Sequence, residues 1–144
     1  MSAPATPSSS NPLAYLGWDA AWESARAGFD PELGPGRVVR VDRGLWSVLT
    51  DRGLERVGLS GDLLDATGDD PVAAPCAGDW VLLRRWCDGR STLEHVLPRR
   101  SAVVRAQASG SSTGQALAAN LDAAVVVAGL DQEPSVSRIE RLLT

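Results

Sequence analysis

Arginine gives this sequence its clearest capacity for chemistry. All 14 basic residues are arginine, and lysine does not occur. A guanidinium group carries a planar fork of N–H donors that binds a phosphate through paired hydrogen bonds. A tryptophan beside such groups can stack on a nucleic-acid base. Nine residues are therefore candidates for nucleic-acid contact: Arg37, Arg40, Arg43, Arg84, Arg85, Trp86, Arg99, Arg100 and Arg105.

The tryptophans within predicted strands have two competing roles. Base stacking contributes roughly 1–3 kcal/mol per base, but a tryptophan in a short strand more often packs into a core. We expect Trp46 and Trp80 to be core residues, which leaves Trp86 as the stacking candidate. Asp79 and His95 lie at a strand entry and within a strand, so we expect structural roles for both.

Charge is distributed unevenly along the chain. The formal net charge is −4, yet the stretch from Arg84 to Arg105 carries +4 and the stretch from Ser60 to Asp79 carries −5. The first stretch favours binding to phosphates, and the second favours binding to a basic protein. Both remain hypotheses, with the nucleic-acid contact preferred.

Several classes of site are excluded by composition. Two cysteines and one histidine are too few for a zinc site, so we expect no metal ligands. A phosphate loop needs a lysine, which the glycine-rich stretch Gly110–Gln115 lacks. No apolar run approaches the roughly 20 residues of a membrane span, which predicts a soluble, cytoplasmic protein without membrane contact. We predict neither catalytic nor cofactor-binding residues in this chain.

Periodicity predicts a mainly β fold with a short helix at its start. Residues 1–12 are small and polar and predict a disordered tail. Asp19 can cap a helix that ends near Gly28. Five segments rich in β-branched and aromatic residues then predict strands: Arg37–Val41, Leu45–Thr50, Leu54–Leu59, Asp79–Trp86 and Ser91–Leu97.

Five strands with one long connection between the third and fourth predict a five-stranded OB-fold barrel over residues 13–106, with an SH3-like barrel as the alternative. We expect a linker at 107–116, because Ser109–Gly114 is rich in glycine and serine. Beyond it, Ala123–Leu130 is typical of a strand buried on both faces, and Pro134–Leu143 of a helix. Residues 117–144 thus predict the first strand and helix of a truncated α/β domain.

Eight segments together resemble the ribosome small-subunit-dependent GTPase A family. The resemblance runs from about Leu13 to the end of the chain, and the order of its segments is more specific than any one of them. They are Leu16-Gly-Trp18, Pro35-Gly-Arg-Val38, Ser60-Gly61, Gly78-Asp-Trp-Val81, Val96-Leu-Pro-Arg-Arg-Ser101, Arg105, Ala118-Ala-Asn-Leu-Asp122 and Arg138–Leu142.

The resemblance implies the N-terminal part of a factor that acts late in assembly of the small ribosomal subunit. In that family an OB fold precedes a circularly permuted GTPase domain, which uses GTP and Mg²⁺, and a domain with structural zinc. The implied partners are the small ribosomal subunit and its rRNA, bound by a monomer, or ribosomal proteins if the acidic stretch is the contact. Asn120-Leu-Asp122 lacks the lysine of the family's guanine-binding motif, so we expect it to be structural and this chain alone to be inactive toward GTP.

Overall fold

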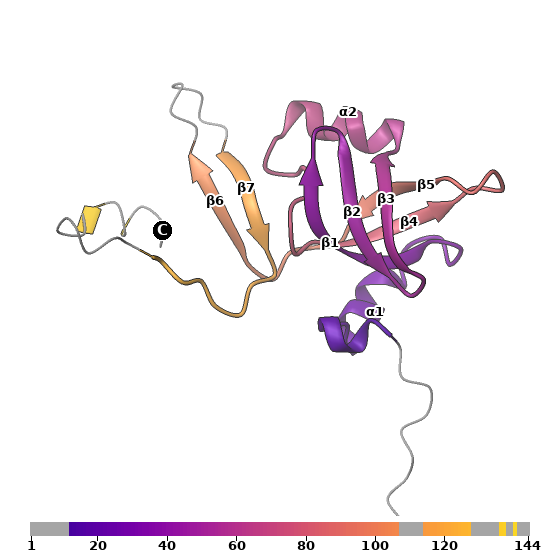
Figure 1. The fold of residues 1–144 in the computed structure, drawn as a ribbon, viewed down its shortest axis with the longest axis horizontal. Helices are drawn as coiled ribbons and strands as arrows, with labels where there is room; N and C mark the ends of the chain where they lie inside the picture. The colour runs from indigo at the N-terminus through magenta and orange to yellow at the C-terminus, as the bar shows by residue number, and fades with distance from the viewer. Residues whose placement is uncertain (1–11, 107–113, 128–135, 138–139, 141–144) are drawn as a thin grey trace, which may run out of the picture.

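The computed structural model describes residues 12–106, 114–127, 136, 137 and 140. Figure 1 shows a barrel with one helix at each end and a separate two-stranded hairpin beside it. The elements in chain order are a 3₁₀ turn at Ala14–Leu16, α1 (Ala20–Arg26), β1 (Gly34–Asp42), β2 (Leu45–Thr50), β3 (Gly53–Leu59), α2 (Gly61–Asp69), β4 (Trp80–Arg85), β5 (Ser91–Val96), β6 (Ala102–Ala106) and β7 (Gly114–Ala119).

The barrel has the strand order of an OB fold, as predicted. It closes in the order β1-β2-β3-β5-β4, with β1 pairing antiparallel to both β2 and β4. Strands β3 and β5 of the barrel pair in parallel over two residue pairs, Gly58 with Thr92 and Leu59 with Leu93. The long connection falls between the third and fourth strands, which is the arrangement that distinguished this fold in the sequence.

Strand β4 is apolar on both faces because it separates two hydrophobic clusters. Successive side chains of a strand point to opposite faces. Val81 and Leu83 face the barrel interior, where they pack with Val38, Val48 and Leu93. On the other face, Trp80 and Leu82 pack with the N-terminal segment, including Leu13, Trp18 and Trp22.

Helix α1 forms where its capping residue predicts. The carboxylate of Asp19 accepts hydrogen bonds from the backbone N–H groups of Ala21 and Trp22, both at 3.0 Å. These bonds satisfy donors that the first turn of a helix leaves free. Trp22 is the buried residue of α1 and packs its ring 6.1 Å from that of Trp80. The cap therefore places an aromatic side chain over the outer face of β4.

The connection Ser60–Gly78 contains a helix that the sequence analysis did not predict. Helix α2 begins after Ser60, whose hydroxyl accepts a hydrogen bond from the N–H of Leu63 at 3.4 Å. Asp62 lies in its first turn, where a negative charge is favourable. Both signals are present in the sequence, but the three glycines and two prolines between Ser60 and Gly78 favoured a connection without regular structure.

The chain beyond the barrel differs from the prediction. Strand β6 begins at Ala102, shortly after Pro98, and pairs antiparallel with β7, so Gly114–Ala116 of the expected linker belong to a strand. Residues 107–113 lie outside the described part. The strand expected over Ala123–Leu130 is not formed across its described residues, 123–127, where Val125 and Val127 are 86% and 89% exposed. A buried strand needs neighbours on both edges, and no described element flanks this one.

The predicted tail falls on residues 1–11, and the predicted helix Pro134–Leu143 lies mostly outside the described residues. Among the helices that the structure describes, none has the length and apolar character needed to span a membrane.

Candidate nucleic-acid interface

Arg99 binds a buried carboxylate and the loop that contains it. Its Nε and Nη2 donate to the two oxygens of Asp79 at 2.8 and 2.7 Å. Further N–H groups donate to the carbonyls of Val72 and Ala74 at 2.5 and 2.8 Å. Asp79 is fully buried and also accepts from the backbone N–H of Cys76 at 2.8 Å. These contacts give Arg99 and Asp79 a structural role at the start of β4.

Arg37 connects three parts of the chain through backbone carbonyls. Its guanidinium donates to the carbonyls of Leu16 in the N-terminal segment, Gly78 before β4 and Asn120 after β7. The bonds to Gly78 and Asn120 measure 3.3 and 3.0 Å. Its side chain therefore fixes the end of the hairpin against the barrel.

Arg100 completes the same junction from the exposed side. It donates to both carboxylate oxygens of Asp19 at 2.7 and 2.9 Å and lies 4.3 Å from the centre of the Trp22 ring. The hydrogen bond from Arg100 is the main cause that lowers the pKa of Asp19 to about 2. The backbone N–H of Arg100 donates to the side-chain oxygen of Asn120 at 2.8 Å.

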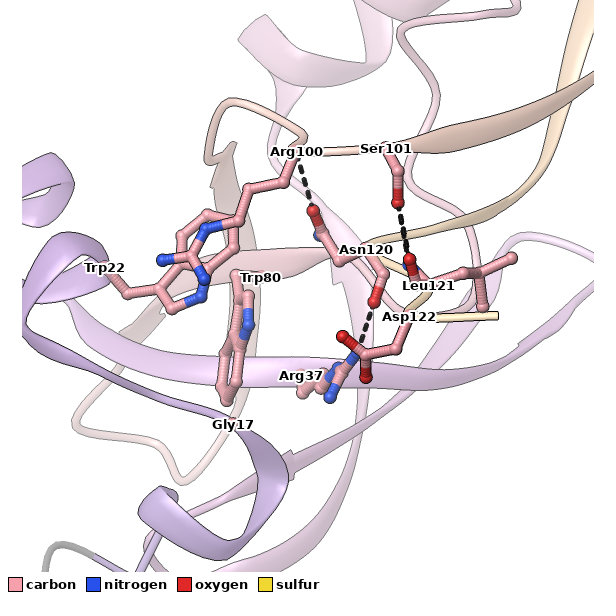
Figure 2. Close-up of a pocket in the computed structure, with 9 residues that line it drawn as sticks. All are labelled: Gly17, Trp22, Arg37, Trp80, Arg100, Ser101, Asn120, Leu121 and Asp122. Carbon is pink, nitrogen blue, oxygen red and sulfur yellow. Dashed lines mark hydrogen bonds between the residues drawn. The ribbon is translucent and has the colours of Figure 1, made fainter. Parts of the chain in front are cut away.

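We call the contacts among Arg37, Gly78, Arg100 and Asn120 the barrel–hairpin joint. Figure 2 shows Arg37, Arg100 and Asn120 of this joint. The amide of Asn120 donates to the Gly78 carbonyl at 3.1 Å, so this side chain bridges Gly78 and Arg100. A cavity of about 100 Å³ remains beside the joint. Most segments that carried the family resemblance meet at this cavity, which is lined by Gly17, Trp22, Arg37, Trp80, Arg100, Ser101, Asn120, Leu121 and Asp122. Asn120 thus has a structural role at the end of the hairpin, whereas the strand expected to follow it is not formed in residues 123–127.

Arg84 and Arg85 pair with acidic side chains around the barrel. Arg85 donates to Asp51 at 2.7 Å and to Glu55 at 3.0 Å. Arg84 donates to Asp30 at 3.0 Å and lies 6.0 Å from the centre of the Trp86 ring. Their charge is largely compensated within the protein.

The remaining candidate arginines project into solvent from several places. Arg40 on β1 forms only an exposed ion pair with Asp42, and its side chain is 72% exposed. In the described part of the chain, Arg43 at the β1–β2 turn and Arg105 on β6 are exposed and make no side-chain hydrogen bond or ion pair. The nine predicted residues thus do not form one cluster.

Exposed arginines that the sequence analysis missed include Arg56 and Arg90. The register aligns Arg40 with Ser47 and Ser47 with Arg56, so both arginines lie in one row across β1, β2 and β3. Neighbouring strands are roughly 4.8 Å apart, which separates their backbones by about 10 Å. The sequence signal that could have identified Arg56 is the alternation within Gly53–Leu59. Arg56 is next to the buried Val57, so its side chain points to the outer face of the strand.

The three tryptophans of the predicted strands, Trp46, Trp80 and Trp86, divide as predicted between core and surface. Trp46 is buried and donates its indole N–H to the Pro75 carbonyl at 2.9 Å, and Trp80 is 1% exposed. Trp86 is 49% exposed and stays the stacking candidate. His95 packs against Phe29 with ring centres 4.8 Å apart, a structural contact.

The two cysteines differ in environment, which predicts different reactivity. Burial, reinforced by the negative charge of Asp79, raises the pKa of the Cys76 thiol to about 12. Cys87 is exposed in the β4–β5 turn. Since the thiolate is the reactive form, we expect a disulfide reagent at pH 8 to modify Cys87 alone in the folded chain and both thiols in urea. Rapid reaction of two thiols without urea would contradict the burial of Cys76.

No group of histidine, cysteine or acidic residues suited to a metal occurs within the described ranges.

The chain is similar in sequence to several proteins named as small ribosomal subunit biogenesis GTPases. It is 47% identical over 137 residues to a small ribosomal subunit biogenesis GTPase RsgA from Streptomyces avermitilis, which covers 94% of this chain and 36% of the relative. Proteins of the same name from Streptomyces coelicolor and Syntrophotalea carbinolica are 42% and 36% identical and match 99% and 92% of this chain, but each over only 38% of its own length.

The comparisons with protein-family models and with solved structures support no further assignment. No protein-family model matches the chain. The crystal structure of YloQ, a circularly permuted GTPase, aligns with a TM-score of 0.39 at 16% identity, covering 51% of this chain and 25% of that one. The chain spans a little over a third of the length of the curated relatives it matches. From the sequence identity to these relatives, the chain belongs to the family of small ribosomal subunit biogenesis GTPases and corresponds to the N-terminal part of its members.

Proposed function

We propose that this chain binds the small ribosomal subunit through rRNA, as part of a cytoplasmic GTPase that assists assembly of that subunit. The observation that carries the proposal is the row of exposed arginines, Arg40 and Arg56, across the outer face of an OB barrel, with Arg43 at the adjoining turn. OB folds commonly present the face of their second and third strands to nucleic acids. We propose GTP hydrolysis with Mg²⁺, and a structural zinc, for the longer relatives and not for this chain.

Exposed arginines suit this role better than the paired ones. Arg37 and Arg99 hold backbone carbonyls and a buried carboxylate, so phosphate binding would require breaking internal contacts. The ion pair of Arg40 with Asp42 is exposed and contributes on the order of 0–1 kcal/mol. A phosphate can displace Asp42 at little cost, and Arg43 needs no displacement at all.

We expect Arg40→Glu with Arg43→Glu to weaken binding to purified small subunits on the order of tenfold or more. Each substitution removes a charged hydrogen bond to phosphate and adds repulsion. Wild-type binding should also weaken as salt rises, and the double variant should show a shallower salt dependence. Cosedimentation with subunits at several salt concentrations measures both effects.

The matched control is Asp62→Ala with Asp65→Ala on α2. These side chains are exposed, so the control removes two charges without disturbing the core. Retained binding in this variant, with loss in the arginine variant, supports rRNA contact. The opposite pattern would refute it.

The opposite pattern would instead support a second candidate function, an adaptor that contacts a basic ribosomal protein. One observation favours it: Leu64 on α2 is 58% exposed between the exposed residues Asp62 and Asp65. An apolar side chain flanked by carboxylates fits a basic protein surface. Binding to whole subunits but not to protein-free rRNA would identify this function.

A further inference from the structure

We propose that a groove between β3 and the β4–β5 turn holds the sugar-phosphate backbone of a single RNA strand. This inference rests on the proposed function and names the form of RNA that the barrel takes. The groove has a volume of about 560 Å³, within the range of sites that hold small organic ligands. It is lined by Glu55, Arg56, Gly58, Gly89, Arg90, Ser91 and Thr92.

The groove is hollow because its walls diverge and two of its residues lack side chains. Strands β3 and β5 pair only at Gly58 with Thr92 and Leu59 with Leu93, so β3 separates from the β4–β5 turn beyond that point. Gly58 has open space where a side chain would project, with no atom within 4 Å of an added Cβ. Gly89 is equally open. A ligand backbone can therefore approach the protein backbone closely at both positions.

The two arginines of the groove supply its available positive charge. Arg56 is exposed and has no acidic partner in the described structure. Arg90 contacts Asp88 at 2.6 Å, but its side chain is 81% exposed, so this ion pair is weak and open to exchange with phosphate. Phosphate is the ligand chemistry that two such guanidinium groups recognise.

The one acidic side chain in the lining is compensated from within. Glu55 accepts hydrogen bonds from Ser91 and Thr50, both at 2.8 Å, and from Arg85 at 3.0 Å. Burial alone would raise the pKa of Glu55, but these three donors hold it below its usual value. The carboxylate is thus ionised, and both of its oxygens are held by internal donors, with Arg85 shared between Glu55 and Asp51.

Trp86 indicates a single strand rather than a duplex. Its indole N–H donates at 2.9 Å to the hydroxyl of Thr92, which lines the groove, and Trp86 as a whole residue is 49% exposed. Single-strand binders combine a basic groove with aromatic rings on which bases stack. In an A-form duplex the bases are stacked on each other, and proteins contact its backbone across a wide surface instead.

Filling the groove tests this inference without changing charge. Gly58→Leu places an apolar side chain in open space, so the fold should persist, as judged by an unchanged melting temperature. We expect it to weaken binding of a labelled oligouridylate of about 12 nucleotides at least tenfold, since one OB fold covers roughly 4–16 nucleotides. Gly28→Leu is the control, because Gly28 is equally open and lies after α1, outside the groove lining. It should bind as the wild type does.

A charge variant gives an independent readout if Gly58→Leu lowers stability. Arg56→Gln should reduce the slope of log affinity against log salt by about 0.7, the value for one phosphate contact with a single strand. Arg52→Gln, at the exposed β2–β3 turn, should leave the slope unchanged. Equal slopes for Arg56→Gln and the wild type would overturn the assignment of Arg56 to phosphate.

The outcomes separate the groove from the proposed function. If the wild-type chain binds neither subunits nor oligouridylate, the proposed function fails. If it binds subunits and Gly58→Leu leaves binding of both probes intact, the groove inference alone is wrong. If Gly58→Leu weakens binding to subunits but not to oligouridylate, or if a duplex of the same length binds better than the single strand, the groove has a different occupant and the inference is overturned.

Discussion

Asp79→Ala is expected to destabilise the chain by about 3–5 kcal/mol, the cost of removing one partner from a buried ion pair. Asp79 is fully buried, and the side chain of Arg99 is 16% exposed. Without the carboxylate, Arg99 and the backbone N–H of Cys76 lose acceptors at 2.7–2.8 Å. Since small domains are stable by roughly 5–15 kcal/mol, urea unfolding should show a large shift of the midpoint.

Two comparisons make this result specific. Asp42→Ala removes the partner of Arg40 from an exposed pair and should cost less than about 1 kcal/mol. Asp79→Ala should also cost less in an Arg99→Met background, because the buried positive charge is then already gone. A loss below about 1 kcal/mol for Asp79→Ala alone would contradict the structural role of Arg99 and return it to the candidates for RNA contact.

Gly78→Ala is expected to release the hairpin from the barrel. A Cβ at Gly78 would lie 2.0 Å from the carbonyl oxygen of Ala119, and the φ of Gly78 is +92°. A positive φ in a residue with a side chain costs roughly 1–3 kcal/mol by itself. The clash is with backbone, so relief requires moving β7 and breaking the 2.9 Å bond from the N–H of Ala119 to the Ala77 carbonyl.

Gly89→Ala separates these two costs. Gly89 has a φ of +82° but open space around the added Cβ, so it should show the conformational cost alone. We expect Gly78→Ala to lose clearly more stability in urea, and to lose amide protection in β6 and β7 while the barrel strands keep theirs. Equal losses for the two variants would mean that contact with Ala119 does not hold the hairpin.

The barrel was predictable because its signals are local. Alternation along Leu45–Thr50 and Gly53–Leu59, turns at Gly44 and Gly53 with positive φ, and the Asp19 cap each act over a few residues. The hairpin was missed because Ala102–Ala106 and Gly114–Ala119 are rich in alanine and lack alternation that favours a strand. Their pairing depends on the joint, which is formed by residues distant in sequence.

The arginines show the limit of sequence reasoning for the site. Residue type correctly identifies a donor, but it does not identify the acceptor. Arg100 pairs with Asp19, 81 residues earlier, and Arg37 bonds to Asn120, 83 residues later. Alternation along β3 indicates that Arg56 points outward, but its place beside β2 and in the groove next to β5 depends on strand pairing.

The placement of the hairpin has a consequence for simultaneous binding. In Figure 1 the β6–β7 hairpin and residues 120–127 lie on one side of the barrel, whereas the β4–β5 turn projects from the other. A strand of RNA lying against that turn leaves the hairpin side unobstructed. If the proposed groove holds rRNA, the hairpin side of the barrel is free for a second macromolecule, and the two would not compete for space.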